Sequence, residues 1–196
     1  MSGGAEQQSW QLAQHIAGAG YAVDALTTCS ASASEEWSRN VLPAGVERAG
    51  DVTIKRFRVD KRDPRAFARV NTALTSFPAT QVKRSVSPLS EDDAMVFETQ
   101  NINSEGLLQY LETEGRRYRA LIFIPYLYGT TLAGIQLVSE RAFLQPCLHN
   151  ESYAYLPAVR RAFHSARGVL FNSLGELEIA VELYGPGIIK KSSLVG

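Results

Sequence analysis

In the segment Leu148-His149-Asn150-Glu151, three polar side chains directly follow an apolar run. A histidine in such a position can shuttle a proton or donate a hydrogen bond to a phosphate, and a carboxylate can orient a sugar hydroxyl. The alternative is a capping loop in which Glu151 or Ser152 starts the next helix. We favour the functional interpretation, which makes His149 and Glu151 the candidate catalytic residues.

A second group of hydroxyls lies in the segment Pro125-Tyr126-Leu127-Tyr128-Gly129-Thr130-Thr131. Its tyrosines offer flat faces of the kind on which sugar rings stack, and all four hydroxyls can form hydrogen bonds. Tyr126, Tyr128 and Thr130 are therefore candidate ligand-binding residues. The alternative is a tyrosine pair packed at a sheet edge, with Thr130 as the cap of the next helix.

Two further loops contain small or polar residues. Gly3 and Gly4 stand directly before a helical pattern, where a backbone can approach closely and the helix N-terminus offers unpaired N–H groups. A phosphate or carboxylate would fit there, and so would a tight turn with positive φ. The pair is not a dinucleotide fingerprint, since no third glycine follows at the required spacing. The fourth loop is Asn172-Ser173, after another strand-like run.

Other kinds of chemistry are not indicated. Cys29 and Cys147 match neither a disulfide framework nor a zinc spacing, and we expect both to be small buried hydrophobic residues. No grouping of His, Cys, Asp and Glu has the spacing of metal ligands, so no metal is expected. No serine-centred nucleophile elbow indicates a hydrolase.

Composition narrows the class of protein further. Lys plus Arg and Asp plus Glu number 20 each, so no bulk charge suggests a nucleic-acid partner. The longest apolar run, residues 120–124, is far too short to span a bilayer. No signal peptide is visible at the N-terminus. We therefore expect a cytoplasmic protein without a transmembrane segment.

Helical and strand-like patterns alternate along the chain, and these elements must position the four loops. Helices are expected over residues 5–17, 63–74, 104–112, 130–138, 153–165 and 174–183. Strands are expected over 21–28, 52–59, 119–125, 143–148 and 168–171, and a loop over 75–90. The alternation predicts an α/β fold with a Rossmann-like, doubly wound, mostly parallel sheet in a single domain. Ligands bind such sheets at the carboxyl ends of the strands.

The loops together resemble one known family, the GT-B glycosyltransferases that use nucleotide sugars and retain anomeric configuration. The start of their acceptor domain is similar to Ser2–Gln7, Leu12-Ala13, Gly20–Val23 and Leu26–Thr28. Its later part is similar to Leu148–Glu151, Ala166–Ser173, Glu176 and Tyr184-Gly185. The last residues, Lys191–Gly196, resemble the linker that leads to the second domain of that family.

The resemblance implies that residues 1–196 form the N-terminal, acceptor-side domain of a GT-B glycosyltransferase, with the C-terminal nucleotide-sugar domain absent. Such a half would bind a glycan or other acceptor, need a separate C-terminal domain or chain, and be inactive alone. The nucleotide sugar would be a substrate, and no cofactor is implied. Gly3 and Gly4 would lie against the donor phosphates, His149 and Glu151 would be catalytic, and the acceptor would contact the remaining candidates, Tyr126, Tyr128, Thr130, Asn172 and Ser173.

One departure from the family pattern concerns the centre of the sheet. Family members have a strand before the Gly-Gly loop, and the resemblance implies that this first strand is missing here. Its place is between the strands expected at 21–28 and 119–125. Each orphaned backbone group costs about 1–3 kcal/mol, so we expect these two strands to pair directly or another segment or chain to fill the slot.

Two other functional classes compete with the glycosyltransferase hypothesis. A non-catalytic α/β binding or interaction module remains the alternative. A nucleotide-dependent oxidoreductase is disfavoured, because its glycine fingerprint and its ribose-binding acid are missing.

Overall fold

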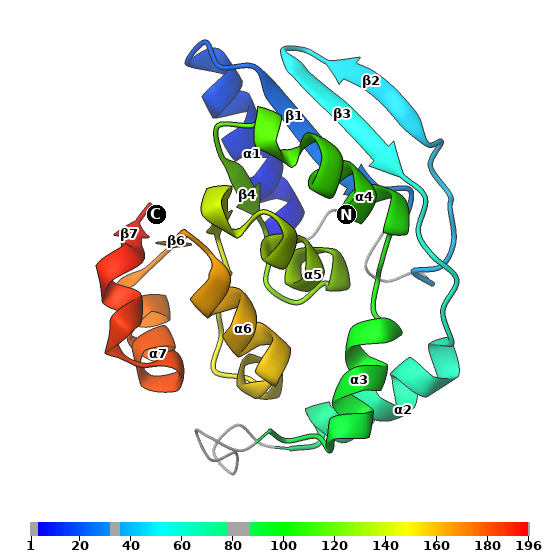
Figure 1. Ribbon diagram of the computed structural model, residues 1–196, viewed down its shortest axis with the longest axis vertical. Coiled ribbons are helices and arrows are strands. Elements are labelled where there is room, and N and C mark those ends of the chain that lie inside the picture. Colours follow the sequence, from blue (N-terminus) through cyan, green and yellow to red (C-terminus); the bar gives the residue numbers. More distant parts are fainter. Residues whose placement is uncertain (1–3, 32–35, 78–86, 196) are drawn as a thin grey trace.

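The computed structural model describes residues 4–31, 36–77 and 87–195, in which helices flank two β-sheets (Figure 1). The helices are α1 (Gly4–Gly18), α2 (Pro64–Thr75), α3 (Glu91–Thr99), α4 (Glu105–Glu114), α5 (Gly129–Leu137), α6 (Pro157–Ser165) and α7 (Leu174–Tyr184). The strands are β1 (Val23–Thr28), β2 (Gly45–Ala49), β3 (Val52–Phe57), β4 (Leu121–Phe123), β5 (Ala142–Leu144), β6 (Gly168–Phe171) and β7 (Ser192–Leu194). The α/β class predicted from the sequence is confirmed.

Side-chain caps explain where two of the helices begin. The Asp63 carboxylate accepts hydrogen bonds from the backbone N–H groups of Arg65 and Ala66, and Pro64 occupies the first turn of α2. The Ser104 hydroxyl accepts from the N–H of Leu107 at the start of α4. Both caps satisfy backbone donors that have no partner inside the helix. The predicted starts of these two helices are therefore confirmed.

Some elements differ from the sequence-based expectation. The strand expected over 143–148 ends at Leu144, because Pro146 has no N–H to donate and Cys147 has a φ of 54°. Strands β2 and β7 and helix α3 were not predicted. Within the loop expected over 75–90, the helix α2 ends at Thr75 and residues 78–86 lie outside the described residues.

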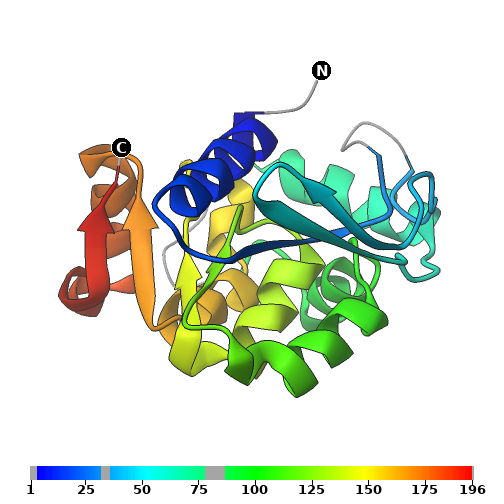
Figure 2. The ribbon, with the colours of Figure 1, turned by 90° about the horizontal axis from the view of Figure 1, so that it is seen from above.

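The strands form two sheets instead of the single sheet expected. The three-stranded sheet has the order β1-β3-β2, in which β1 and β3 are parallel and β2 is antiparallel. The four-stranded sheet has the order β4-β5-β6-β7, and all its neighbours are parallel. Helix α1 lies on one side of the strands, and α4 and α5 lie on the other (Figure 2).

β1 and β4 are each the end strand of their sheet, and the second edge of each pairs with no strand of the described residues. The expectation that the two strands pair directly, or that another segment lies between them, is therefore wrong for the described part of the chain. Solvent access explains the result: every residue of β1 is at least partly exposed, and Ile122 of β4 is 37% exposed. Water can satisfy backbone groups that would be costly to leave unpaired in a sealed core.

The main hydrophobic core lies around the four-stranded sheet and the helices α2, α3, α5, α6 and α7. Phe163 of α6 and Phe171 of β6 are fully buried, with ring centroids 6.5 Å apart, and Tyr184 of α7 lies 4.3 Å from Phe163. This core fixes the strand ends that carry the candidate site residues.

A smaller cluster lies where α4 covers both sheets. Leu107 and Leu111 of α4 pack with Leu121 of β4. Leu26 of β1 and Phe57 of β3 are partly buried against the same three leucines. The small cluster therefore connects the free edges of β1 and β4 through side chains, although their backbones do not pair.

A helix that could cross a membrane would have to be both long and apolar. No helix of the described residues meets both conditions.

Candidate functional site

Three side-chain amides meet at the carboxyl ends of β5 and β6. Asn172 follows β6, and its Oδ1 accepts hydrogen bonds from Gln8 Nε2 at 2.6 Å and from Gln145 Nε2 at 2.8 Å. Gln8 belongs to α1, and Gln145 directly follows β5. We call Gln8, Gln145 and Asn172 the amide cluster. It lies at the edge where open parallel sheets bind their ligands.

The start of α7 fixes the orientation of Asn172. Glu176 accepts hydrogen bonds from the backbone N–H of Asn172 at 3.1 Å and from its Nδ2 at 3.2 Å. The Ser173 hydroxyl accepts from the N–H of Glu176 at 3.2 Å and caps the helix. This reciprocal pattern resembles a capping box. Asn172 therefore contacts the amide cluster, while the predicted neighbour Ser173 caps α7.

Gln145 has a buried acceptor without a partner. The residue is 4% exposed, and its Oε1 forms no hydrogen bond within the described part of the chain. An unsatisfied buried acceptor costs about 1–3 kcal/mol. A hydroxyl or N–H group of a ligand that reached this oxygen would remove the cost. The amide cluster is therefore suited to a ligand rich in hydrogen-bond donors.

Cys147 borders the amide cluster as a neutral thiol. Its Sγ lies 3.4 Å from Gln8 Oε1 and 3.8 Å from Asn172 Nδ2. Burial and the negative charge of Glu176 raise the pKa of the thiol above its ordinary value. A protonated thiol is a poor nucleophile, so covalent chemistry at this sulfur is not favoured. Cys29 is fully buried as expected, whereas Cys147 is only partly buried.

Tyr126 and Glu151, both predicted site residues, contact each other. The Tyr126 hydroxyl donates to Glu151 Oε1 at 2.7 Å, and the backbone N–H of Tyr126 donates to the carbonyl of Pro146 at 3.3 Å. Tyr126 is 0% exposed, so its ring face is not accessible to a ligand in this structure. Burial and the charge of Glu151 raise the pKa of the phenol well above its ordinary value. The pair holds the loop after β5 against the end of β4.

Tyr128 and Thr130 lie at the start of α5, where their contacts are with residues outside the amide cluster. Tyr128 is the cap residue, and its ring makes an edge contact with Trp37 at 5.8 Å. The N–H of Thr130 donates to the carbonyl of Ile102 at 3.1 Å. A Cβ placed on Gly129 would lie 2.2 Å from the side chain of Asn103, so the chain before α4 packs directly on this helix start. Thr130 is not the helix cap that the alternative interpretation assigned to it.

His149 and Gly4 are both exposed. His149 lies on the loop between Cys147 and Glu151, and its carbonyl accepts from the N–H of Glu151 at 2.9 Å. Gly4 is the first residue of α1, one helical turn before Gln8, and a Cβ added to it would meet nothing within 4 Å. Gly4 has no positive φ, and Gly3 lies outside the described residues.

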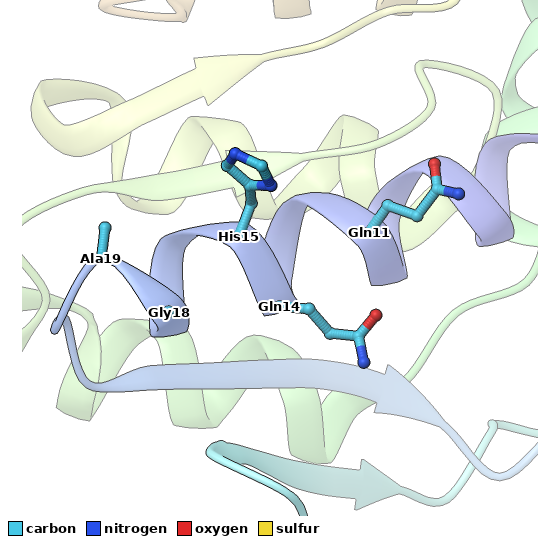
Figure 3. Close-up of a pocket in the computed structure, with 5 residues that line it drawn as sticks. All are labelled: Gln11, Gln14, His15, Gly18 and Ala19. Atoms are coloured by element: carbon cyan, nitrogen blue, oxygen red, sulfur yellow. The ribbon is translucent and has the colours of Figure 1, made fainter.

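A shallow hollow of about 720 Å³ lies on the outer surface of α1. Its lining residues are all exposed, and they are Gln11, Gln14, His15, Gly18 and Ala19. Figure 3 shows that the side chain of Gln14 points toward β1 and that His15 points to the opposite side of the helix. Because these side chains diverge, the hollow does not focus several polar groups on one ligand.

Gln8 and Gln145 are the members of the candidate site that the sequence analysis missed. Gln145 could have been found, because it follows an expected strand and the carboxyl ends of parallel strands are the expected ligand edge. Gln8 carried no such signal. Its contact with Asn172 joins residues 164 positions apart in the chain, and no local pattern reports such a contact.

Neither a metal-ligand group among the described residues nor a similar known protein indicates what this site does. The described residues contain no group of three or more His, Cys, Asp or Glu side chains that could hold a metal ion. Comparison with family models, curated proteins and solved structures finds no match to this chain.

Proposed function

We propose that this chain is the acceptor-side half of a retaining, nucleotide-sugar-dependent glycosyltransferase with a Rossmann-like, GT-B type fold. The observation that carries the proposal is the amide cluster at the carboxyl ends of parallel strands, in which Gln145 Oε1 has no hydrogen-bond partner among the described residues. The parallel four-stranded sheet of this chain supports the same assignment, and so does the resemblance of its loops to the acceptor domains of that family.

Amide groups are suited to the recognition of a sugar acceptor. A sugar hydroxyl both donates and accepts, so one hydroxyl can donate to Gln145 Oε1 while its oxygen accepts from a neighbouring amide. A site built to hydrogen-bond a hydroxyl rejects analogues that lack it, because the buried polar group is then left unpaired. The capping contacts of Asn172 hold the cluster in place before the acceptor arrives.

Transfer of the sugar would form one bond and break one bond at the anomeric carbon of the donor. The acceptor oxygen bonds to that carbon, and the diphosphate leaves with the electron pair of the broken carbon–oxygen bond. The hydroxyl proton passes to a base, for which exposed His149 is the candidate. N–H groups at the start of α1, near Gly4, would face the diphosphate. A second domain would hold the nucleotide, as the family resemblance implies.

In this assignment Glu151 and Tyr126 position the acceptor loop, because the carboxylate already accepts from the buried phenol. Tyr128 and Thr130 lie with Trp37 and Ile102 at the start of α5 and support the shape of the sheet edge.

Acceptor binding can be tested on the chain by saturation-transfer NMR with a panel of mono- and oligosaccharides. We expect at least one saccharide to bind, and Gln145→Leu to weaken that binding at least tenfold. The matched control is Gln11→Leu, which changes an exposed glutamine of α1 outside the amide cluster and should leave binding unchanged. Thermal melting of each variant separates a loss of binding from a loss of folding.

Two results would contradict the proposal. One is equal saccharide binding by both variants, which would place the site elsewhere. The other is a folded wild-type protein that binds no saccharide in the panel, which would favour the non-catalytic interaction module.

A further inference from the structure

The hydrogen bonds of the amide cluster have a direction, because a side-chain amide donates only through its nitrogen and accepts only through its oxygen. Such a cluster can be joined in two ways, with either Asn172 Oδ1 or Asn172 Nδ2 facing the two glutamines. The two arrangements differ in which atom of Gln145 remains for a ligand. The group that selects one arrangement therefore decides what kind of ligand the cluster can bind.

Glu176 selects the arrangement that the structure has. An ionised carboxylate can only accept hydrogen bonds. Glu176 accepts from the backbone N–H of Asn172 at 3.1 Å and from its Nδ2 at 3.2 Å. Asn172 therefore turns its nitrogen toward the carboxylate at the start of α7 and its oxygen toward the glutamines.

The same direction is passed on to both glutamines. Because Asn172 Oδ1 is an acceptor, Gln8 and Gln145 both donate to it through Nε2, at 2.6 Å and 2.8 Å. Gln8 Oε1 then faces the Cys147 thiol at 3.4 Å, and Gln145 Oε1 has no partner in the described part of the chain. Gln8, Asn172 and Cys147 are partly exposed, so the cluster borders solvent. The atom left for a ligand is thus a buried acceptor.

We propose that Glu176 is a positioning residue that sets the specificity of the amide cluster: it leaves Gln145 Oε1 as the free atom, which selects a ligand group that donates a hydrogen bond. A hydroxyl, an amine or an amide N–H meets this requirement. An ether, a carboxylate or a phosphate oxygen does not, because two acceptors would face each other without a proton. That the ligand is a sugar rests on the proposed function, whereas the role of Glu176 does not.

Glu176→Gln should reverse the direction of the whole cluster. The backbone N–H of Asn172 can only donate, so it would bind the oxygen of the new amide and leave the new nitrogen facing the Asn172 side chain. Asn172 would then turn its Oδ1 toward α7 and offer one hydrogen of Nδ2 to each glutamine. The free atom of Gln145 would become Nε2, which is a donor. Every bond of Asn172 is kept in this arrangement, so the variant should melt close to the wild type.

The first measurement requires no ligand. In proton–nitrogen NMR spectra of the side-chain amides, the Gln145 proton bonded to Asn172 should lie downfield of the signals of exposed Gln11, and Gln145→Leu identifies it by its absence. In Glu176→Gln this proton should lose its downfield shift. The matched control is Glu178→Gln, which removes the same charge from an exposed position of α7 and should leave the Gln145 signal unchanged.

The second measurement compares saccharides that differ in one hydroxyl. The probes are the methyl glycosides of glucose, mannose and galactose and their monodeoxyfluoro analogues, in which fluorine cannot donate. For a glycoside that binds, one fluorine position should weaken saturation-transfer NMR binding to the wild type and to Glu178→Gln by about tenfold or more. The same replacement should change binding to Glu176→Gln by less than about threefold, because its free atom donates.

The outcomes separate this proposal from the proposed function. An unchanged Gln145 signal in Glu176→Gln would overturn the proposal, and so would a variant that melts far below Glu178→Gln. Equal sensitivity of the two variants to fluorine would show that Glu176 does not set the specificity. If no glycoside binds while the Gln145 signal still moves, the role of Glu176 stands and the sugar-binding function fails.

Discussion

The two middle strands of the four-stranded sheet are mostly buried, whereas the strands of the three-stranded sheet are mostly exposed or partly exposed. In β5 and β6 most side chains are buried, including Leu144, Val169 and Phe171, whereas Val52 is the one buried strand residue of the described three-stranded sheet. The chain composition does not explain this contrast, because β1 and β3 also contain Val, Leu and Ile. What differs is that β5 and β6 lie in the main hydrophobic core, where the rings of Phe163, Phe171 and Tyr184 pack together.

Polar contacts take a larger part in holding the three-stranded sheet. Lys55 of β3 donates to Asp24 of β1 at 2.6 Å and to the Tyr110 hydroxyl at 2.7 Å, and the Tyr118 hydroxyl donates to the same carboxylate. Burial raises the pKa of Asp24, but the hydrogen bonds from Lys55 and Tyr118 outweigh it and leave the pKa below its ordinary value. We therefore expect the loss of an apolar side chain to destabilise the protein most in the four-stranded sheet. The loss of a charged side chain should matter most in the three-stranded sheet.

The largest expected effect follows from removing one buried ring of the four-stranded sheet. Phe171→Ala would delete a fully buried side chain next to Phe163 and lower the free energy of unfolding by about 3–5 kcal/mol. The matched variant Phe57→Ala removes a partly buried ring of β3 and should cost less than half as much. Urea unfolding of the two variants measures the difference. Equal losses would show that the two sheets are stabilised alike.

The second prediction concerns the charged network of the three-stranded sheet. Asp24→Ala removes an acceptor shared by Lys55 and Tyr118, and we expect a loss of about 2 kcal/mol in the free energy of unfolding. The control is Glu47→Ala, which breaks the exposed ion pair with Arg56 and should not change stability measurably. Thermal and urea unfolding of both variants provide the measurement. If the two variants were equally stable, the network would contribute no more than a surface ion pair.

Elements with a local sequence signal could be predicted, whereas elements that depend on long-range pairing could not. The cap residues Asp63 and Ser104 place two helix starts, and the apolar run Gly168–Phe171 places β6 without error. Strand β2, by contrast, has the sequence Gly-Val-Glu-Arg-Ala and is mostly exposed, so it owes its conformation to pairing with β3. Strand β7 has three residues, two of them exposed, and gives no periodic signal.

The same division applies to the candidate site. Asn172 and Ser173 were predicted because the ends of parallel strands are the expected ligand edge; Asn172 lies in the amide cluster, whereas Ser173 caps α7. The partner Gln8 was not found, because its contact depends on how α1 packs across the sheet. Glu151 was predicted as a candidate catalytic residue, and its bond with the buried Tyr126 hydroxyl could not be predicted from the sequence.

The third prediction concerns the hydrogen bond between Tyr126 and Glu151, a polar contact beside the hydrophobic core of the four-stranded sheet. Glu151→Ala would leave the Tyr126 hydroxyl buried without its acceptor and cost about 1–2 kcal/mol. Tyr126→Phe in the same chain removes the orphaned donor, so the double variant should recover most of that loss. A double-mutant cycle measured by urea unfolding tests the coupling. Additive losses would contradict the assigned bond.

The fourth prediction is that acid weakens the ion pair between Glu36 and Arg62, which lies outside both sheets and stacks on Trp37 and Phe67. Arg62 forms a two-bond ion pair with Glu36, which lowers the pKa of that carboxyl from 4.5 to about 2. A lowered folded-state pKa stabilises the protein above pH 4.5, and the stabilisation is lost as the pH falls from about 5 to 2. Because a third of the Glu36 side chain is exposed, we expect a contribution of about 1 kcal/mol.

Glu36→Gln provides the measurement for this acid effect. The variant should be less stable than the wild type at pH 7, and the difference should shrink between pH 5 and pH 2. Phe171→Ala removes apolar contacts with Phe163 that do not depend on pH, so it should keep the same deficit over this range. A pH-independent deficit for Glu36→Gln would show that the ion pair is not the cause.

The smallest expected change in stability belongs to His149. Its side chain is exposed, and it lies on a loop that Glu151 already holds, so His149→Ala should alter the free energy of unfolding by less than about 0.5 kcal/mol. If His149 accepts the acceptor proton, the same variant should slow transfer by about 100-fold or more once a nucleotide-sugar domain is supplied. Melting curves and transfer rates of His149→Ala and His164→Ala, side by side, separate these effects, because His164 lies on α6 with its side chain beside Lys191 and Arg160. Early melting of His149→Ala with full transfer would establish the capping loop, and it would remove the one exposed base that the proposal places at this edge of the four-stranded sheet.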